Sequence, residues 1–398
     1  MVVDRWDHPT AFSLWGEEEK AAIDRVLTSG QFTMGEEVAA LEEEFAEFHG
    51  RRHAVMVNSG SSANLVAVAA LFCKSINPLR RDDDQWRGRQ VACPALAWST
   101  LYAPLIQHGL KLVLADADET WNAPIPQPFP DPPPRLMVIC SILGNPCYGA
   151  AWEREAARSD SYLIHDNCES FGAVDDHGIF ASNYGLLSTH SLFYSHQLSA
   201  IEGGLVLTDD EELANLCRIL RAHGWTRDVW HDPFMNPVPP PRFELEYEFT
   251  HFGYNVRGLE MHAAIAREQL RKTKQFQLER MMNAHRFAML TNGLPISFPQ
   301  WKGKPNPFGL HFMCDREEDR ADLVAALRAN GIDARLPTGG SLRLHPYGKA
   351  YAHQATPNAD AIHRRGLFLG NAPFDISDKI EKAAKVMRAV FDAKARAA

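Results

Sequence analysis

Apolar and polar positions along the first half of the chain alternate between two patterns. Apolar residues over 38–48 recur at the spacing of one helix face, and Gly50 follows as the expected end of that helix. A helical stretch that is apolar except at Asn64 runs over 63–72. Short apolar runs typical of buried strands lie at 54–57, 91–93, 111–114, 136–139, 162–164 and 205–207. Strands this short, separated by helices, predict a parallel sheet covered on both faces.

The later part of the chain continues with helical patterns. We predict helices over 260–271 and 315–330, with Asp315 as the capping residue of the second and Gly331 just beyond its end. A chain of 398 residues exceeds one ordinary core, so we expect two domains. The predicted division is an N-terminal arm with a large domain over 1–250 and a smaller domain over 251–398.

Charge and composition narrow the class of protein. The 50 acidic and 41 basic residues leave a net charge of −9, and no long run of Lys or Arg indicates a nucleic-acid or membrane surface. The first residues lack the pattern of a signal peptide, and no apolar run approaches membrane-spanning length, so we expect a cytoplasmic protein. No two cysteines have the spacing of a metal-binding knuckle, which favours buried reduced thiols and no metal site.

Two segments carry candidate chemistry. Asn58-Ser59-Gly60-Ser61-Ser62 lies between a predicted strand and a helix, where free backbone N–H groups and the helix dipole favour a phosphate. Asp166 follows the apolar run 162–164, at the sheet edge where open α/β folds bind ligands. A carboxylate there could keep a pyridine nitrogen protonated. Taken alone, the first segment fits an ordinary turn equally well, and an isolated Asp fits a surface turn better.

A third segment, 191–204, adds the sequence that makes a family resemblance clear. Together with 58–63 and 163–170, and in the same order, it resembles the DegT/DnrJ/EryC1/StrS family of sugar aminotransferases. Further matches lie at 29–35, 94–100 and 253–257, so the resemblance covers nearly the whole chain. It implies the fold-type I architecture of aspartate aminotransferase, an α/β fold with a mostly parallel seven-stranded sheet in a large domain and a smaller α+β C-terminal domain.

The family pattern implies a site for pyridoxal 5′-phosphate. By position, the cofactor-binding candidates are Gly60, Ser61, Ser62 and Ser191 for the phosphate, Trp98 for stacking on the ring, and Asp166 for the pyridine nitrogen. Asn255 matches an asparagine that reaches the phosphate from the neighbouring subunit. The resemblance therefore implies a homodimer with shared active sites.

The chain departs from the family at two positions. His196 stands where the family has its Schiff-base lysine, and Glu169 stands where relatives usually have Gln. No lysine occurs between Lys111 and Lys272 to replace the missing amine. Imidazole cannot form the stable imine that a primary amine forms, but it can carry protons near neutral pH. We therefore expect an untethered cofactor, with His196 and Asp166 as the catalytic residues and Glu169 facing the cofactor's phenolic oxygen.

This combination resembles one branch of the family, the 3-dehydratases of nucleotide-linked 4-keto-6-deoxyhexoses, and 143–146, 166–169 and 221–227 match it as well. The branch implies removal of the sugar's C3 hydroxyl, with GDP-4-keto-6-deoxymannose as the expected substrate. Glutamate would regenerate the pyridoxamine 5′-phosphate form, and ammonia would be released. Another histidine-containing branch uses a cysteine-ligated iron–sulfur cluster. The cysteine spacing here differs, so we expect no reductase partner.

Five further residues are candidates for substrate contacts: Phe32, Met34, His223, Arg227 and Arg335. Of these, Arg335 is the candidate for the carboxylate of the amino donor, because a guanidinium can bind a carboxylate through two hydrogen bonds. Gly340 replaces an Asn of the nearest relatives, which leaves the identity of the sugar open. Two alternatives also stay open. One is a nucleotide-sugar aminotransferase with an untethered cofactor, and the other is a catalytically inactive homologue that binds a nucleotide sugar.

Overall fold

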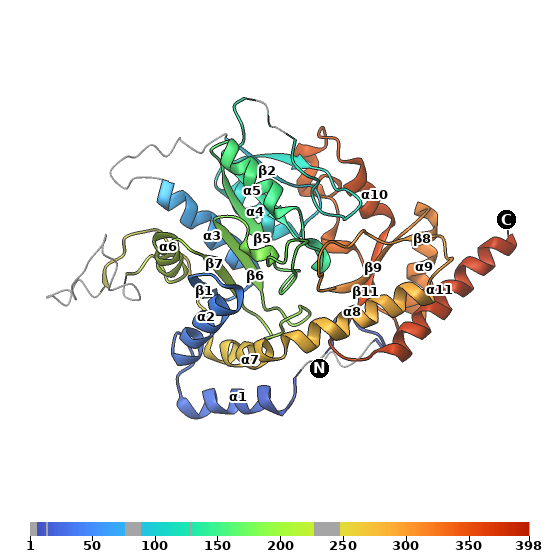
Figure 1. The fold of residues 1–398 in the computed structure, drawn as a ribbon, viewed down its shortest axis with the longest axis horizontal. Helices are drawn as coiled ribbons and strands as arrows, with labels where there is room; N and C mark the ends of the chain where they lie inside the picture. Colours follow the sequence, from blue (N-terminus) through green and yellow to red (C-terminus); the bar gives the residue numbers. More distant parts are fainter. Residues whose placement is uncertain are drawn as a thin grey trace.

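A seven-stranded sheet forms the centre of the large domain (Figure 1). The computed structural model describes residues 6–12, 15–75, 89–127, 129, 131–226 and 247–397. In spatial order the strands are β1 (His53–Val57), β7 (Gly204–Thr208), β6 (Leu187–Ser191), β5 (Tyr162–Asp166), β4 (Leu136–Cys140), β2 (Gln90–Pro94) and β3 (Lys111–Ala115). Strand β7 is antiparallel to both neighbours, and all other neighbouring pairs are parallel. The predicted, mostly parallel sheet is confirmed.

The six predicted strands are all present in this sheet, and one strand of the sheet, β6, was not predicted. Strand β6 has the sequence Leu-Ser-Thr-His-Ser, which lacks an apolar run, yet all five residues are buried. It lies between β5 and β7, so its backbone pairs on both sides. Sheet hydrogen bonds compensate the backbone groups of a buried strand whatever its side chains are, which is why hydropathy alone does not find β6.

Helices cover both faces of this sheet, as the sequence predicts. Along β1, Val55 and Val57 pack into one core with the helix α3, while Ala54 and Met56 pack into a second core with α2 and α7. Strand residues alternate between faces, so the run 54–57 of β1, which is buried on both faces, can be apolar at every position. The helices of this layer are α2 (Glu36–His49), α3 (Gly60–Ser75), α4 (Ser99–Gln107), α5 (Gly149–Arg158), α6 (Glu211–Arg221) and α7 (Glu260–Arg271).

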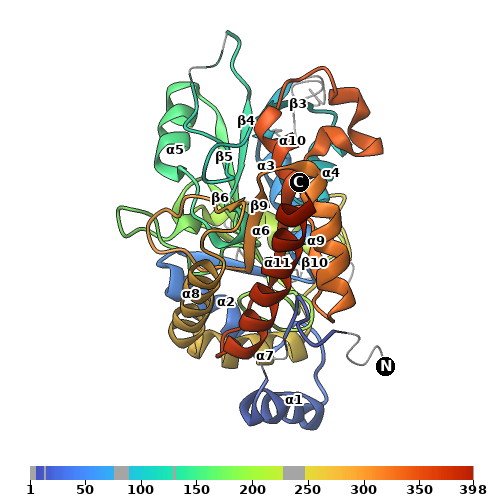
Figure 2. The ribbon, with the colours of Figure 1, turned by 90° about the vertical axis from the view of Figure 1, so that its right-hand side faces the viewer.

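A smaller antiparallel sheet lies beside the large domain. Its order is β10 (Ala334–Arg335), β11 (Gly366–Gly370), β9 (Gly309–Cys314) and β8 (Ile296–Ser297). Its surrounding helices are α8 (Thr273–Leu290), α9 (Glu317–Ala329), α10 (Pro357–Arg365) and α11 (Ser377–Ala397), and α1 (Glu17–Ser29) packs against α7 at the far end of the molecule (Figure 2). Short 3-10 turns are Ile142–Gly144, Ala181–Asn183, Pro337–Gly339, Leu342–Leu344 and Pro346–Tyr351. This arrangement confirms the fold predicted for the C-terminal part.

The domain boundary at 250 and 251 stays a prediction, and the proline-rich residues 237–241 lie outside the described residues. Helix α7 follows that boundary in sequence, yet Ala263 and Ile265 pack with Leu41 in the core of the large domain. The long helix α8 then leads from α7 to the smaller sheet (Figure 1).

Two predicted helix ends have different outcomes. Gly50 has a φ of 66° and ends α2 as predicted. The prediction of Asp315 as the cap of α9 is wrong, because Arg316 occupies the capping position and makes no side-chain capping bond. The Asp315 backbone N–H instead donates to the Pro295 carbonyl, beside the β8–β9 pair. The acidic residues Glu317, Glu318 and Asp319 favour the start of α9 through the helix dipole.

The cysteines are mostly buried free thiols, as the sequence predicts. All seven cysteines are free, and five of them are buried. Cys73 and Cys168 are partly exposed. In the part of the chain that the structure describes, no helix is both long and apolar enough to cross a membrane.

Candidate active site

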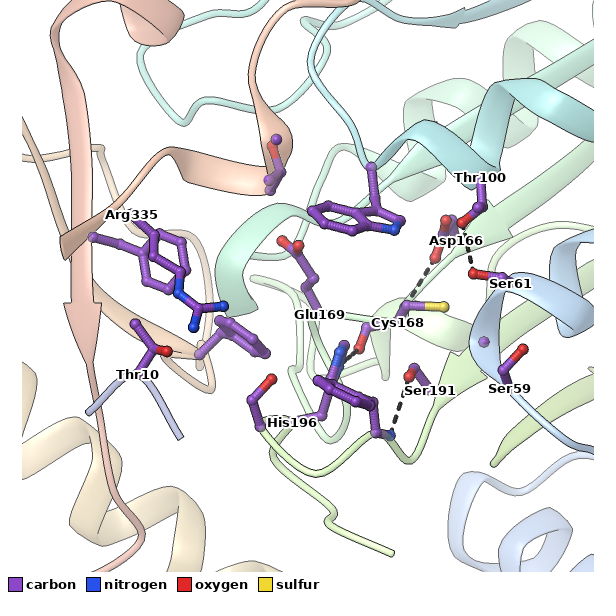
Figure 3. A pocket seen from close by; sticks show the side chains of 18 of the residues that line it. Thr10, Ser59, Ser61, Thr100, Asp166, Cys168, Glu169, Ser191, His196 and Arg335 are labelled. Carbon is purple, nitrogen blue, oxygen red and sulfur yellow. Dashed lines mark hydrogen bonds between the residues drawn. The ribbon is translucent and has the colours of Figure 1, made fainter. Parts of the chain in front are cut away.

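A cavity of about 900 Å³ lies at the carboxyl edge of the large sheet and is bordered on the other side by residues of the smaller domain. Asp166 and Ser191 end β5 and β6, and the turn after β1 supplies Gly60. Figure 3 shows Ser61, Thr100 and Asp166 at one end of the cavity and Thr10 and Arg335 at the other. Glu169 and His196 lie between the two ends.

The end of the cavity near α3 has the features of an anion site. The Ser62 backbone N–H donates to Ser59 Oγ at 3.1 Å, so Ser59 caps the helix N-terminus. The hydroxyls of Ser61 and Thr100 lie 2.7 Å apart, and Ser191 also lines the cavity. Ser62, a predicted phosphate contact, is not among the lining residues, and its hydroxyl accepts a hydrogen bond from Ser59. Three hydroxyls and a helix N-terminus together suit a phosphate.

Gly60 allows the turn and the end of β6 to meet. A Cβ at this position would lie 2.6 Å from Ser191 Cβ and 2.8 Å from Cys168 Sγ, which is closer than real contacts allow. The absence of a side chain at Gly60 therefore brings the helix N-terminus next to Ser191. Any larger residue would separate the parts of the anion site.

Asp166 is held firmly in one orientation. Its Oδ2 accepts a hydrogen bond from Asn64 Nδ2 at 2.8 Å, and its Oδ1 accepts from the Cys168 backbone N–H at 2.9 Å. Thr189 Oγ1 in turn donates to Asn64 Oδ1 at 2.7 Å, which fixes the amide. Asp166 is buried yet lines the cavity, so a bound group at this point would meet an oriented carboxylate.

Glu169 lies in an environment that favours its protonated form. Burial raises the pKa of Glu169 to about 8, Asp166 adds to the rise, and the hydrogen bond from the Leu143 backbone N–H opposes it. That bond reaches Glu169 Oε2 at 3.0 Å. Near neutral pH the carboxyl is therefore mostly protonated and can both donate and accept a hydrogen bond. In this form it resembles the Gln that family members usually carry here.

His196 is oriented by the backbone of the residues that follow β5. Its Nδ1 lies 2.5 Å from the carbonyl oxygen of Cys168, which has no proton to donate, so Nδ1 carries the proton and Nε2 is free to accept one. The ring packs edge-on against Phe308. Burial lowers the pKa of His196 to about 4. The hydrogen bond to the Cys168 carbonyl raises this pKa, and the charge of the buried Arg280 lowers it by a smaller amount than burial does. The side chain is thus a neutral base at neutral pH.

Trp98 and Arg335 complete the cavity. Trp98 is 57% exposed, a large fraction for an indole, and its ring borders the cavity next to the backbone of Gly339. Arg335 lines the opposite end beside Thr10 (Figure 3). Among the described residues that line the cavity none is a lysine.

The remaining predicted site residues lie elsewhere. Phe32, His223 and Asn255 are exposed and Met34 is partly buried, and none of the four lines the cavity. The segments that carry them are joined by backbone hydrogen bonds, from His223 N to the Tyr254 carbonyl and from Glu260 N to the Phe32 carbonyl. These candidates therefore gather on one outer surface next to the β1–α3 turn. Arg227 lies outside the described residues.

The sequence did not single out several residues that line the cavity: Thr10, Asn64, Thr100, Cys168, Phe308, Arg328 and Asp333. For Asn64 a signal exists, because it lies one helical turn after Gly60 and so faces the same way. Thr10 has no such signal, since it lies far from every motif along the chain.

Known proteins resemble the whole chain. The chain is 37% identical over 395 residues to GDP-4-keto-6-deoxy-D-mannose 3-dehydratase of Yersinia pseudotuberculosis, covering 96% of this chain and 98% of the relative. A solved structure of the Escherichia coli GDP-4-keto-6-deoxy-D-mannose-3-dehydratase with bound hydrated PLP is 35% identical with a TM-score of 0.86, covering 96% and 99% of the two chains. A structure of such a dehydratase with a trapped PLP-glutamate geminal diamine is 35% identical with a TM-score of 0.85, covering 96% and 100%.

The fold and the order of the site segments agree with a family-level match. The sequence profile of the DegT/DnrJ/EryC1/StrS aminotransferase family matches residues 14–390, which includes both sheets and nearly all of the cavity lining. The resemblance predicted from the motifs is thereby confirmed. The chain belongs to the DegT/DnrJ/EryC1/StrS aminotransferase family.

Proposed function

We propose that the protein is a pyridoxal-phosphate-dependent dehydratase that removes the C3 hydroxyl of a nucleotide-linked 4-keto-6-deoxyhexose. GDP-4-keto-6-deoxymannose is the proposed substrate, as in the 3-dehydratases that the chain resembles. The observation that carries the proposal is His196, a neutral base in a cavity without a lining lysine among the described residues, beside an intact and oriented Asp166. An aminotransferase of this family that tethers its cofactor would need an amine at that place.

The residues present fit the cofactor. The N-terminus of α3 with Ser61, Thr100 and Ser191 would hold the phosphate, and Asp166 would hold the protonated ring nitrogen. Trp98 offers an exposed flat face for the ring, and protonated Glu169 would donate a hydrogen bond to the ring's phenolic oxygen. When bound, the cofactor supplies an electron sink that weakens the bond to the neighbouring hydroxyl.

His196 would carry the proton transfers. Its Nε2 is free to accept a proton, while the bond from Nδ1 to the Cys168 carbonyl keeps the ring in place. After accepting the proton, Nε2 can donate it to the departing C3 oxygen, so one imidazole serves both as base and as acid. The lowered pKa of His196 makes the protonated ring a strong acid, which favours the second transfer.

Glutamate would serve as the amino donor, with Arg335 binding its carboxylate. The overall change is balanced without a reductase. The C3 oxygen of the sugar leaves as water, and glutamate becomes 2-oxoglutarate, whose keto oxygen comes from water, with release of ammonia. Glutamate thus supplies both electrons, so the reaction requires no iron–sulfur partner.

The proposal extends to a homodimer with shared sites. Its support is the surface that carries Phe32, His223 and Asn255, which lies next to the β1–α3 turn but does not line the cavity of its own chain. A second copy would bring these side chains to the partner's cavity. Met34 and Arg227 belong to the same proposed set.

The proposal is tested by product analysis. The protein is incubated with pyridoxal phosphate, glutamate and GDP-4-keto-6-deoxymannose, and the nucleotide sugar is analysed by mass spectrometry while ammonia and 2-oxoglutarate are measured. The expected product has lost one oxygen, with one ammonia released for each turnover. A retained amino sugar would identify an aminotransferase instead. Cofactor binding without any turnover would identify an inactive homologue.

A further inference from the structure

Residues 8–10, called the N-terminal segment below, lie along the smaller domain and reach the cavity. The His8 backbone N–H donates to the Gly331 carbonyl at 3.1 Å, and the Asp333 backbone N–H donates to the His8 carbonyl at 2.9 Å. His8 therefore pairs with Ile332 as a parallel bridge. Its buried ring also bonds through Nε2 to the Gly370 carbonyl at 2.8 Å. The backbone of the segment is thus fixed at the point where it enters the smaller domain.

Gly370, the last residue of β11, shows how closely the segment approaches. A Cβ at Gly370 would lie 1.9 Å from the Pro9 carbonyl oxygen and 2.9 Å from Thr10 Cα. Only glycine leaves room for the chain to pass here. The close contact places Thr10, which is 6% exposed, at the wall of the cavity.

Thr10 and Arg335 donate hydrogen bonds to the same oxygen atom. Thr10 Oγ1 and Arg335 Nε each lie 3.0 Å from Asp333 Oδ2. Within the described ranges, no hydrogen bond from the terminal nitrogens of Arg335 is found. The Nε edge of the guanidinium is therefore held, and the edge formed by Nη1 and Nη2 stays available. Figure 3 shows Arg335 and Thr10 together at this end of the cavity.

We propose that Thr10 and Asp333 are positioning residues that orient Arg335 for the carboxylate of the amino donor. The inference rests on the proposed function and deepens it, because it assigns the N-terminal segment to the amino-donor half of the reaction. A carboxylate is bound best through two parallel hydrogen bonds from one edge of a guanidinium. Holding Arg335 by Nε leaves that edge free and directs it into the cavity.

The need for Thr10 follows from the exposure of Arg335. The Arg335 side chain is 59% exposed, and an ion pair at such a site holds a long side chain only weakly. An arginine side chain loses rotamer entropy when it is fixed. Thr10 and the paired backbone restrict Asp333, so Asp333 presents one defined oxygen to Arg335. The arginine is then oriented before the donor arrives.

The test separates the two half-reactions. Thr10→Val removes the hydroxyl at similar volume, Thr10→Ser retains it, and Asp333→Ala removes the shared acceptor. Conversion of the cofactor from its aldehyde to its amine form by glutamate is followed by absorbance, without sugar. Separately, protein preloaded with pyridoxamine phosphate is given the keto sugar. Thr291→Val is the matched control, because Thr291 is also buried but, directly after α8, bonds the Phe287 carbonyl of that helix.

We expect Thr10→Val to raise the KM for glutamate roughly two- to tenfold with little change in kcat, as loss of one hydrogen bond would do. Asp333→Ala should raise it at least as much, and the double variant no further, since both residues act through one link. Thr10→Ser should restore the wild-type KM, and Thr291→Val should not change it. Binding of glutarate, measured by titration calorimetry, should weaken in parallel, and the sugar half-reaction should be unaffected.

An unchanged glutamate KM in Thr10→Val and Asp333→Ala would overturn the inference. Equal losses in both half-reactions would also overturn it, because they would indicate a general structural effect. The proposed function has a separate outcome. If the wild-type protein converts the cofactor with glutamate but leaves the sugar's hydroxyl in place, the proposed dehydratase fails while the positioning of Arg335 stands.

Discussion

The Nδ1 atom of His196 lies within hydrogen-bond distance of the carbonyl oxygen of Cys168, two residues beyond Asp166. The strand that ends in the proposed pyridine-binding carboxylate thus also orients the proposed base. A carbonyl can only accept, so the tautomer of His196 is fixed with Nε2 unprotonated. The positions of His196 and Asp166, the two candidate catalytic residues, are therefore linked through the backbone of residues 166–168.

The acid limb of the profile of kcat/KM against pH should reflect the buried environment of His196. The pKa of His196 is lowered to about 4, chiefly by burial, so the neutral base persists well below the ordinary histidine value of 6.5. We expect kcat/KM of the sugar half-reaction to hold as pH falls through 6.5 and to decline only as pH approaches the lowered value. The measurement is kcat/KM against pH with preloaded protein. An acid limb centred at or above 6.5 would contradict the assignment.

The alkaline limb of the pH profile of activity should depend on the protonation of Glu169. Its pKa is raised to about 8, so the carboxyl loses its proton, and its ability to donate a hydrogen bond, as pH rises through that value. Gln keeps the shape and the donor but cannot ionise. We expect Glu169→Gln to retain activity near neutral pH within about threefold and to lack the alkaline decline near pH 8. If the decline persists unchanged in Glu169→Gln, another group is responsible for it.

A buried histidine cluster formed by α2, β5 and β6 should make the fold sensitive to acid. His49, His165 and His190 are buried, and burial lowers the pKa of each, to about 3 for His49 and for His165. Between pH 6.5 and the lowered values, the unfolded chain binds protons that the folded chain excludes. The free energy of unfolding therefore falls as pH falls, by up to about 1.4 kcal/mol per pH unit for each histidine.

His190→Leu tests this linkage. In the described structure neither ring nitrogen of His190 has a hydrogen-bond partner, so leucine removes a titrating group without breaking a side-chain bond. The stability of wild type should fall more steeply than that of the variant between about pH 7 and about pH 5 in urea titrations. His285→Leu is the control, because His285 is exposed. Parallel stability curves for wild type and His190→Leu would contradict the prediction.

The sequence motifs located the part of the site that is formed by the ends of the strands of the large sheet. Asp166 and Ser191 end strands, and a residue at the carboxyl end of a strand faces the ligand edge of an α/β sheet, so their placement follows from the pattern. The other part of the site depends on contacts between distant segments. The bond between Thr10 and Asp333 joins residues 323 positions apart, and neither residue belongs to a recognisable pattern. Protonation states were equally beyond the sequence, because burial determines them.

Replacement of His196 by lysine tests the central assignment. Lysine restores the amine of the family, and the wild-type ring lies in the cavity beside Phe308 and Cys168, so the new side chain would enter the same space. We expect the variant to hold pyridoxal phosphate through a covalent bond that borohydride reduces to a stable adduct, whereas wild type should give no adduct. Mass spectrometry of the treated proteins measures both.

The same variant should lose the sugar chemistry. An amine accepts a proton only when it is neutral, and the ordinary lysine pKa is about 10.4. Burial would lower the pKa of the new lysine, but the surroundings of His196 are arranged for an imidazole and would not adjust the amine's pKa to the value that the reaction needs. The amine would also compete with glutamate for the cofactor. We therefore expect at least the roughly hundredfold loss of C3 deoxygenation that follows removal of one positioned acid–base group. His196→Gln is the control, because it should lose the activity without gaining the covalent bond. If His196→Lys binds the cofactor covalently and still removes the hydroxyl at the wild-type rate, the histidine is not the reason that this protein is a dehydratase.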